Sequence, residues 1–283
     1  MQSLKTRLRG TVLHTPLKML VAPPRRLRRW WQVERWRRRM RRFYAQFIKP
    51  GELVFDVGAN FGSRTRVFLE LGARVVAVEP QKECARYLLA SFGSDSNFHL
   101  VNKALGAASG TSDLFILKHP RTASLSLEHM RAVHFEKHQA GTLEKSGRVS
   151  VTTLDALIHQ YGSPAFVKID AEGFEYEIMR GLSQPLTALS FEFVPTYLEP
   201  ALKSIDYLLR FGTMRLNYVV GERFEWMLDE WVTADELIPT LKSYAPETHF
   251  IYGDVYVRFE DEQRSHNTHS FRRTPWTNNK QTH

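Results

Sequence analysis

From residue 50 onward the chain alternates short apolar runs with amphipathic segments, and this alternation constrains its fold more than any other feature. The runs at 53–58, 73–80, 98–105 and 165–170 predict buried strands, and helices are predicted between them, as at 62–72 and 81–93. Strands that alternate with helices favour a mostly parallel sheet covered on both faces. The last run, 248–259, directly follows a predicted helix and is expected to pair in the antiparallel direction.

Charge is distributed unevenly along the 283 residues. Residues 1–49 contain 15 Lys and Arg but only one acidic residue, a net charge of +14, whereas the rest of the chain contains 24 basic and 29 acidic residues, a net charge of −5. We therefore predict a basic arm over 1–49, one catalytic domain over 50–259 and a polar tail over 260–283. The single cysteine, Cys84, agrees with a reducing compartment, so a cytoplasmic location is expected.

The arm contains an amphipathic segment at residues 27–48. Its apolar residues recur at helical spacing and form one stripe, with arginines around the rest. Three interpretations remain open: the stripe packs on the domain, the helix lies on an anionic membrane at its inner face, or the arginines bind nucleic acid. An Arg-rich, acid-free start also describes organellar transit peptides, which is an alternative for residues 1–30. The stripe consists of Trp30, Val33, Trp36, Met40, Phe43 and Phe47.

The stretch FDVGANFG, residues 55–62, lies between the first predicted strand and helix. Counted from Gly58, it lacks two of the three glycines of the nicotinamide-binding pattern, and the phosphate-loop pattern also fails after Gly62. Glu79 follows at the end of the next strand, where a carboxylate can accept both hydroxyls of a ribose. Asp56 can anchor an ammonium group. A ribose with a cationic amino-acid tail matches S-adenosylmethionine, and a simple strand–helix turn is the structural alternative.

The motifs together resemble the FkbM-type S-adenosylmethionine-dependent methyltransferases. The resemblance rests on FDVGANFG, VVAVEP, NKALG at 102–106, TLDAL at 153–157 and VKIDAEGFEYEIMRG at 167–181, in this order. It implies a seven-stranded class I methyltransferase sheet whose last strand is antiparallel. It also implies methyl transfer to oxygen, usually a hydroxyl on a sugar, glycolipid, polysaccharide or related metabolite. The positions that it assigns to the cofactor are Asp56, Gly58, Ala59, Asn60, Gly62, Glu79, Pro80, Asn102, Lys103, Ala104 and Asp170.

Transfer to a hydroxyl requires a positioned acceptor and a base that removes its proton. Asp170 and Glu172, in the turn after a predicted strand, are the candidate bases. Lys168 lies two residues before Asp170 on the same face of the strand and can pair with it. Glu192, near the end of the next strand, is a candidate acceptor contact. Asp170 with Glu192 is also an alternative divalent-metal pair, although no metal site is favoured.

The segment 118–147 is long enough to cover the site, and its polar residues are candidate acceptor contacts. They are His119, Arg121, Thr122, Ser124, His129, His134 and His138. The sequence thus predicts an O-methyltransferase that acts on a hydroxyl of a carbohydrate, glycolipid or related metabolite. The alternatives are a nucleic-acid methyltransferase that uses the arm, disfavoured by the acidic body and the absence of an NPPY motif, and a cofactor-binding module without catalysis. The sequence does not indicate the oligomeric state.

Overall fold

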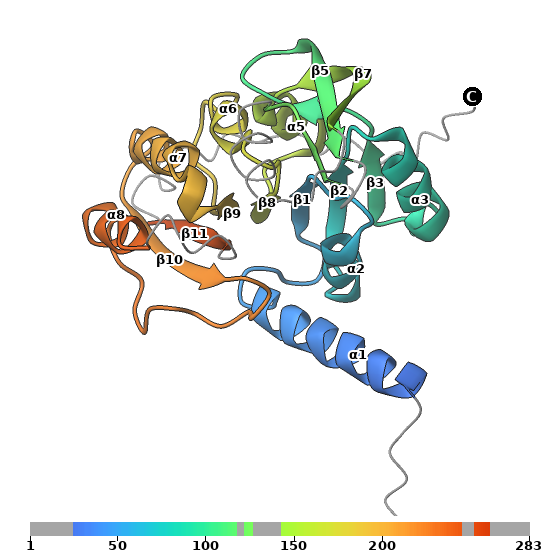
Figure 1. Cartoon of the computed structure of the whole chain (residues 1–283), viewed down its shortest axis with the longest axis horizontal. Coiled ribbons are helices and arrows are strands. Elements are labelled where there is room, and N and C mark those ends of the chain that lie inside the picture. Colours follow the sequence, from blue (N-terminus) through green and yellow to red (C-terminus); the bar gives the residue numbers. More distant parts are fainter. Residues whose placement is uncertain (1–24, 118–121, 127–142, 245–251, 261–283) are drawn as a thin grey trace, which may run out of the picture. The chain divides into compact units, whose positions relative to one another are not determined.

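The computed structural model describes residues 25–117, 122–126, 143–244 and 252–260 (Figure 1). Contacts divide the chain into two units, residues 1–36 and 37–283, which we describe separately. In the first unit, the described residues form the beginning of helix α1 (Arg25–Tyr44). Residues 1–24 of the basic arm predicted over 1–49, and residues 261–283 of the polar tail predicted over 260–283, lie outside the described residues. The predicted domain boundaries therefore stay predictions.

The second unit is built on a seven-stranded sheet with the strand order β10-β11-β9-β8-β1-β2-β3. Strand β11 pairs in the antiparallel direction with β9 and β10, and all other neighbours are parallel. This arrangement confirms the predicted class I methyltransferase sheet and its antiparallel last strand. The strands are β1 (Leu53–Val57), β2 (Arg74–Val78), β3 (Phe98–Val101), β8 (Phe166–Ile169), β9 (Ala188–Phe193), β10 (Met214–Val220) and β11 (Gly253–Phe259).

Helices cover both faces of this sheet, with α6 and α7 on one side and α2 on the other (Figure 1). Alternate strand residues supply the two cores because successive side chains point to opposite faces. Phe55 and Val57 belong to the core beneath α5–α8, whereas Ala77 packs with residues of α3. The helices are α2 (Ser63–Glu70), α3 (Lys82–Phe92), α5 (Leu154–Tyr161), α6 (Glu175–Met179), α7 (Glu199–Leu209) and α8 (Ala234–Lys242), and a 3-10 turn, η2 (Pro195–Tyr197), precedes α7.

The last turns of α1 belong to the core of the second unit. Met40 and Tyr44 are fully buried, and the ring of Phe43 lies 4.6 Å from that of Trp226, in the loop after β10. Phe47 stacks on Tyr256 of β11 at 5.6 Å. This packing confirms the first interpretation of the apolar stripe for its C-terminal half, which an aromatic cluster holds against the sheet.

A second sheet of four strands, in the order β4-β7-β5-β6, follows the first three strands of the main sheet. The prediction of one strand over 98–105 was wrong, because the chain turns between β3 and β4. The side-chain amide of Asn102 donates to the carbonyl oxygens of Glu79 and Pro80, at 2.7 and 3.2 Å, and ties this turn to the end of β2. The four strands are β4 (Ala104–Leu105), β5 (Gly110–Leu117), β6 (Thr122–Ser124) and β7 (Leu143–Thr152).

Candidate functional site

The turns after β1 and β8 meet at the carboxyl edge of the main sheet. The amide of Asp170 donates to the carbonyl of Val57 at 3.0 Å, and that of Gly58 donates to Val78 at 2.9 Å. A Cβ atom on Gly58 would lie 1.8 Å from the carbonyl oxygen of Asp170, and Gly58 has φ of +76°. Only glycine tolerates both the contact and the dihedral, so this residue allows the two turns to converge.

A cavity of about 260 Å³ opens between these turns, the end of β2 and the second sheet. Such a position, outside the carboxyl ends of the strands, is where open α/β sheets bind ligands. Of the residues predicted to bind the cofactor, nine border the cavity: Asp56, Gly58, Ala59, Asn60, Glu79, Pro80, Lys103, Ala104 and Asp170.

Gly62 and Asn102 do not line the cavity, but they support the loops that line it. A Cβ atom on Gly62 would lie 2.6 Å from the ring of Phe92 and 2.7 Å from a methyl of Leu88, so the loop packs closely against α3. Asn102 holds the turn after β3, as described above. Both residues thus shape the loops that carry the cavity-lining side chains.

Glu79 is 2% exposed at the end of β2, and its carboxylate is already oriented by backbone amides. Asn60, with φ of 49°, donates its amide to Oε2, and Gln81 donates to Oε1, each at 2.8 Å. Burial raises the pKa of Glu79 to about 7, although the two amides act in the opposite direction. Each carboxylate oxygen retains a lone pair, which suits the pair of hydroxyls on a ribose.

Asp56 lies at the base of the cavity, at the end of β1. It is buried and accepts a hydrogen bond of 2.5 Å from the hydroxyl of Thr65 in α2. Burial raises its pKa, and the Thr65 bond and the charges of Arg64 and Lys168 oppose this shift. A cationic ligand group would remove much of the cost of burying this carboxylate.

Part of the cavity lining is apolar. Leu105 of β4 and Leu114 of β5 come from the second sheet, and Phe174 and Ile178 come from the segment after β8. Lys103 and Ala104 complete this wall. The second sheet therefore contributes one side of the site, which the linear sequence did not reveal.

Asp170 and Glu172, the candidate bases, both border the cavity. Glu172 has φ of 51°, in the left-handed region that a non-glycine residue rarely adopts. Its carbonyl oxygen accepts a hydrogen bond of 2.7 Å from the hydroxyl of Ser124 in β6. This hydrogen bond connects the second sheet to the turn. Ser124 was predicted as an acceptor contact, and in the structure its hydroxyl binds the backbone of the turn that carries the candidate bases. The other acceptor contacts predicted in this segment lie outside the described residues: His119, Arg121, His129, His134, His138 and the side chain of Thr122.

Lys168 lies beneath the cavity and is fully buried. Its Nζ is 2.9 Å from Oδ1 of Asp254 and 3.6 Å from Oδ2 of Asp170, and it donates to the carbonyl of Ile169 at 3.1 Å. Burial acts to lower the pKa of Lys168, but the two carboxylates outweigh it and raise the pKa. The residue is therefore a fixed cation that orients Asp170 rather than a group that exchanges protons.

Glu192 lies beside the cavity and not on its surface. It borders a small void together with Glu175 and Tyr197, and its Oε2 is buried with no hydrogen-bond partner among the described residues. Burial, reinforced by the carboxylates of Glu172 and Asp170, raises the pKa of Glu192 well above its ordinary value. Burial and these carboxylates thus favour the neutral form of Glu192, which lines the small void and not the cavity.

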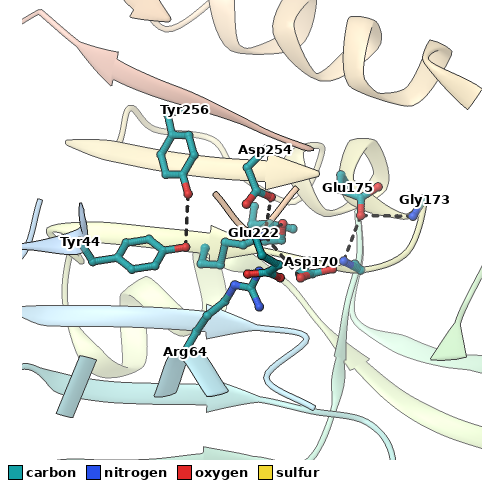
Figure 2. A network of polar contacts seen from close by, with 11 residues as sticks. Tyr44, Arg64, Asp170, Gly173, Glu175, Glu222, Asp254 and Tyr256 are labelled. Carbon is teal, nitrogen blue, oxygen red and sulfur yellow. Dashed lines mark hydrogen bonds and ion pairs between the residues drawn. The ribbon is translucent and has the colours of Figure 1, made fainter. Parts of the chain in front are cut away.

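Sequence reasoning missed an ion pair across the cavity edge. Arg64, in the first turn of α2, donates from Nη2 to Oε1 of Glu222 at 3.0 Å, and Arg64 also borders the cavity. Figure 2 shows these side chains with Asp170 and Asp254, and Tyr44 and Tyr256 with their hydroxyls 3.3 Å apart. Glu222 follows β10, 158 residues after Arg64. No local sequence pattern indicates that Arg64 pairs with Glu222. The position of Arg64 shortly after the glycine-rich loop was, however, a usable signal that this arginine borders the cavity.

In the described parts of the chain, no group of three or more His, Cys, Asp or Glu side chains is placed to hold a metal ion. Within the same parts, no helix has the length and apolar character needed to span a membrane.

Comparison with known protein families agrees with the fold. The sequence profile of the FkbM methyltransferase domain matches residues 56–238. No curated protein sequence matches the chain.

Solved structures with a similar arrangement share little sequence with this chain. An O-methyltransferase from Bacillus cereus in complex with SAH has a TM-score of 0.43 and 8% identity, over 86% of this chain and 94% of that chain. A precorrin-6y C5,15-methyltransferase from Geobacter metallireducens GS-15 has a TM-score of 0.38 and 11% identity, over 80% and 87%. For an rRNA methylase from Streptococcus thermophilus these values are 0.37 and 12%, over 78% and 94%.

The chain belongs to the FkbM methyltransferase family, because the family profile covers more than half of it. It is therefore an S-adenosylmethionine-dependent methyltransferase. The residues of the cavity fit this cofactor: Glu79 offers acceptors for ribose hydroxyls, the apolar lining residues offer contacts for a ring, and Asp56 offers a partner for an ammonium group.

Proposed function

We propose that this methyltransferase acts on oxygen, at a hydroxyl of a neutral carbohydrate, glycolipid or related polyhydroxylated metabolite. The observation that carries the proposal is the pair of carboxylates, Asp170 and Glu172, on the wall of the cavity. A hydroxyl acceptor must lose a proton during transfer, and a carboxylate within hydrogen-bond reach can accept it. When bound, the cofactor supplies a methyl group on a cationic sulfur, which is an electrophile.

The protein's own side chains divide the remaining work. The carboxylates of Asp170 and Glu172 are candidates to orient the acceptor hydroxyl and to take its proton. Lys168 fixes Asp170 from below through its ion pair. Glu79 and the turn after β1 hold the donor in place, which supplies the positioning on which such a displacement mainly depends.

The charge of this edge supports a neutral acceptor. The charged residues that line the cavity are the acids Asp56, Glu79, Asp170 and Glu172 and the cations Arg64 and Lys103. Carboxylates suit the hydroxyls of a sugar, whereas they repel a phosphate backbone. The net charge of −5 over residues 50–283 argues in the same direction against nucleic acid.

An acceptor screen with a radiolabelled methyl donor tests this proposal. Transfer to neutral glycans or glycolipids is expected, and Asp170→Asn or Glu172→Gln should lower kcat by about 10²–10⁴-fold for the residue that acts as base. Glu172→Gln should retain affinity for S-adenosylhomocysteine, which separates proton removal from donor binding, whereas Asp170 is also a predicted cofactor contact and its variant is judged on kcat. Transfer to RNA only, or full kcat in both variants, would contradict the proposal.

For the arm, we propose peripheral binding to an anionic membrane surface. Trp31 and Val33 are 47% and 56% exposed, and the segment 1–36 has nine basic residues and one acidic residue. Tryptophan and arginine together favour the interface of an anionic bilayer. The proposal predicts that the full chain sediments with vesicles that contain phosphatidylserine and not with phosphatidylcholine alone.

Two variants of the full chain make this test specific. Trp31→Ser and Arg35→Glu should each reduce sedimentation, whereas Lys242→Glu, which changes an exposed charge on α8, should not. Equal sedimentation of all three variants would refute the arm's role. Salt-dependent binding to RNA without vesicle binding would favour the nucleic-acid alternative instead.

A further inference from the structure

The peptide group between Glu172 and Gly173 has a hydrogen-bond partner at each of its polar atoms. The carbonyl oxygen of Glu172 accepts from the hydroxyl of Ser124 at 2.7 Å, and the amide of Gly173 donates to Oε1 of Glu175 at 3.2 Å. Figure 2 shows the second of these contacts. One partner belongs to β6 of the second sheet and the other to helix α6. Two distant elements therefore fix the peptide that directly follows a candidate base.

The hydroxyl of Ser124 is oriented for its bond to this turn. Its oxygen accepts from the amide of Ser126 at 2.8 Å, so its hydrogen is left for the carbonyl of Glu172. Ser124 is only 2% exposed, so water competes little for the bond. The contact is thus a defined part of the cavity wall, which Ser124 and Glu172 both border.

Glu175 fixes the chain on both sides of Glu172. Its Oε1 accepts from the amides of Ala171 and Gly173, at 3.0 and 3.2 Å, and the residue is only 3% exposed. Since these two amides flank Glu172 in the sequence, a single oxygen sets the path of the chain before and after the candidate base. A carbonyl oxygen has two lone pairs and can accept both bonds without a negative charge.

The conformation fixed in this way is one that Glu172 would not keep alone. Its φ is 51°, and that of Gly173 is +87°. A left-handed conformation costs a non-glycine residue free energy and persists where its surroundings impose it. Gly173 imposes no preference of its own, because it lacks a Cβ atom. Relaxation of Glu172 to a negative φ would redirect its Cα–Cβ bond, and with it the carboxylate at the cavity wall.

We propose that Ser124 and Glu175 are positioning residues for methyl transfer, which hold Glu172 in the left-handed conformation that directs its carboxylate to the acceptor. The inference rests on the proposed function, in which Glu172 orients the acceptor hydroxyl or takes its proton. Both residues act through the backbone of the turn and not on the reacting atoms. The second sheet thereby gains a role beyond lining the cavity, because β6 supplies one of the bonds.

Hydrogen exchange of the Gly173 amide tests this hold on the turn without any acceptor. The full chain is saturated with S-adenosylhomocysteine, and Ser124→Ala and Glu175→Leu each remove one of the two partners. Exchange of the amide should be about tenfold faster in Glu175→Leu and several-fold faster in Ser124→Ala, because an amide exchanges when its bond opens. Glu175→Gln keeps an acceptor oxygen in place and should exchange nearly as slowly as the wild type.

Kinetics test whether this hold serves the transfer. With S-adenosylmethionine and a neutral glycan from the acceptor screen, Ser124→Ala and Glu175→Leu should lower kcat by about 10- to 100-fold and change the KM for the donor by less than about twofold. Glu175→Gln should restore most of kcat. In a Glu172→Gln background the carboxylate is absent, so Ser124→Ala should lower kcat by less than about twofold further.

Two variants of neighbouring residues serve as controls. Ser112→Ala removes a hydroxyl from β5 of the same sheet, one that contacts the carbonyl of Asp113 and not the turn. Glu177→Leu removes a carboxylate of α6 that pairs with Arg180. Neither should change the exchange of Gly173 or kcat. Thermal unfolding of every variant checks that the fold is intact.

Faster exchange, together with a loss of kcat that disappears in the Glu172→Gln background, supports the inference. Wild-type exchange or full kcat in both Ser124→Ala and Glu175→Leu overturns it. A loss of kcat that is equally large in the Glu172→Gln background also overturns it, because the two residues would then act on the fold in general. Full kcat in Glu172→Gln alone would instead contradict the role of Glu172 in the proposed function, whatever the exchange rates.

Discussion

Lys168 and Asp254 form an ion pair inside the protein, with 2.9 Å between Nζ and Oδ1 although 86 residues separate them in the sequence. The pair links β8 to β11, the antiparallel strand inserted next to β9. Since Lys168 also reaches Asp170, the same cation connects the sheet to the turn that carries the candidate bases.

Removal of one partner from this pair should lower the stability of the protein. Lys168→Met leaves the buried carboxylate of Asp254 uncompensated and should reduce the free energy of unfolding by about 3–5 kcal/mol. Urea denaturation measures this loss. The exposed pair between Lys203 and Glu199 provides the control, because Lys203→Met should change stability little. Similar stabilities for the two variants would show that the buried pair is not structurally important.

The convergence of the turns at Gly58 predicts a sharp difference between two glycines. Gly58 and Gly51 have φ of +76° and +82°, so alanine at either position adds left-handed strain of about 1–2 kcal/mol. Only at Gly58 does the new Cβ also collide with the carbonyl of Asp170, since nothing lies within 4 Å of a Cβ on Gly51.

Gly58→Ala should therefore be much less stable than Gly51→Ala and should lose donor binding, whereas Gly51→Ala should bind normally. Chemical denaturation and calorimetry with S-adenosylhomocysteine measure the two effects. Equal behaviour of the two variants would exclude a special role for the approach of the turns.

Donor affinity should depend on pH through Glu79. The pKa of this residue is about 7, so the carboxylate forms as pH rises through neutrality. Ribose hydroxyls donate hydrogen bonds, and the ionised form accepts them better. Affinity for S-adenosylhomocysteine should thus rise by about tenfold from pH 6 to pH 8, because at low pH the free protein holds a proton that must leave when the ligand binds.

Glu79→Gln removes the titrating group and keeps the shape of the side chain, although its NH2 cannot accept one of the two backbone hydrogen bonds. The variant should bind more weakly at pH 8 and should lose most of the pH dependence. A wild-type affinity that is flat over this range, or a slope that persists in Glu79→Gln, would assign the titration to another group.

The end of α1 should be part of the folding unit. Phe43 is 6% exposed and contacts the rings of Trp226 and Tyr256, so Phe43→Ala should cost about 3–5 kcal/mol in the free energy of unfolding. Trp31→Ala, at an exposed position of the same helix, should change stability little. If Phe43→Ala unfolds at the same urea concentration as the wild type, the packing of α1 on the sheet does not contribute to stability.

The fold was predictable because its signals are local. Strands such as β1 and β2 are continuous apolar runs, and the turn that follows Val57 carries its glycines in sequence. The placement of Asp56 and Glu79 on one cavity follows from the same rule, since parallel strands bring their carboxyl ends to one edge. The resemblance to a family then supplied the seven-stranded class I sheet, which periodicity leaves open.

The missed features depend on contacts between distant segments. The Arg64–Glu222 pair and the Lys168–Asp254 pair join residues 158 and 86 positions apart, and no spacing rule connects them. The break at Asn102 was missed because an apolar pattern continues through it, while a side-chain hydrogen bond to Glu79 turns the chain. That break separates the two sheets, so the wall formed by the second sheet was missed with it.

The left-handed backbone of Glu172 has a consequence for variation at this position. Holding a non-glycine residue at φ of 51° costs about 1 kcal/mol or more, and glycine would adopt the same dihedral freely. Stability alone would thus favour glycine here, while proton removal or acceptor binding would favour the carboxylate. A library selected for thermal stability should accumulate the substitution Glu172→Gly, and one selected for methyl transfer should exclude it.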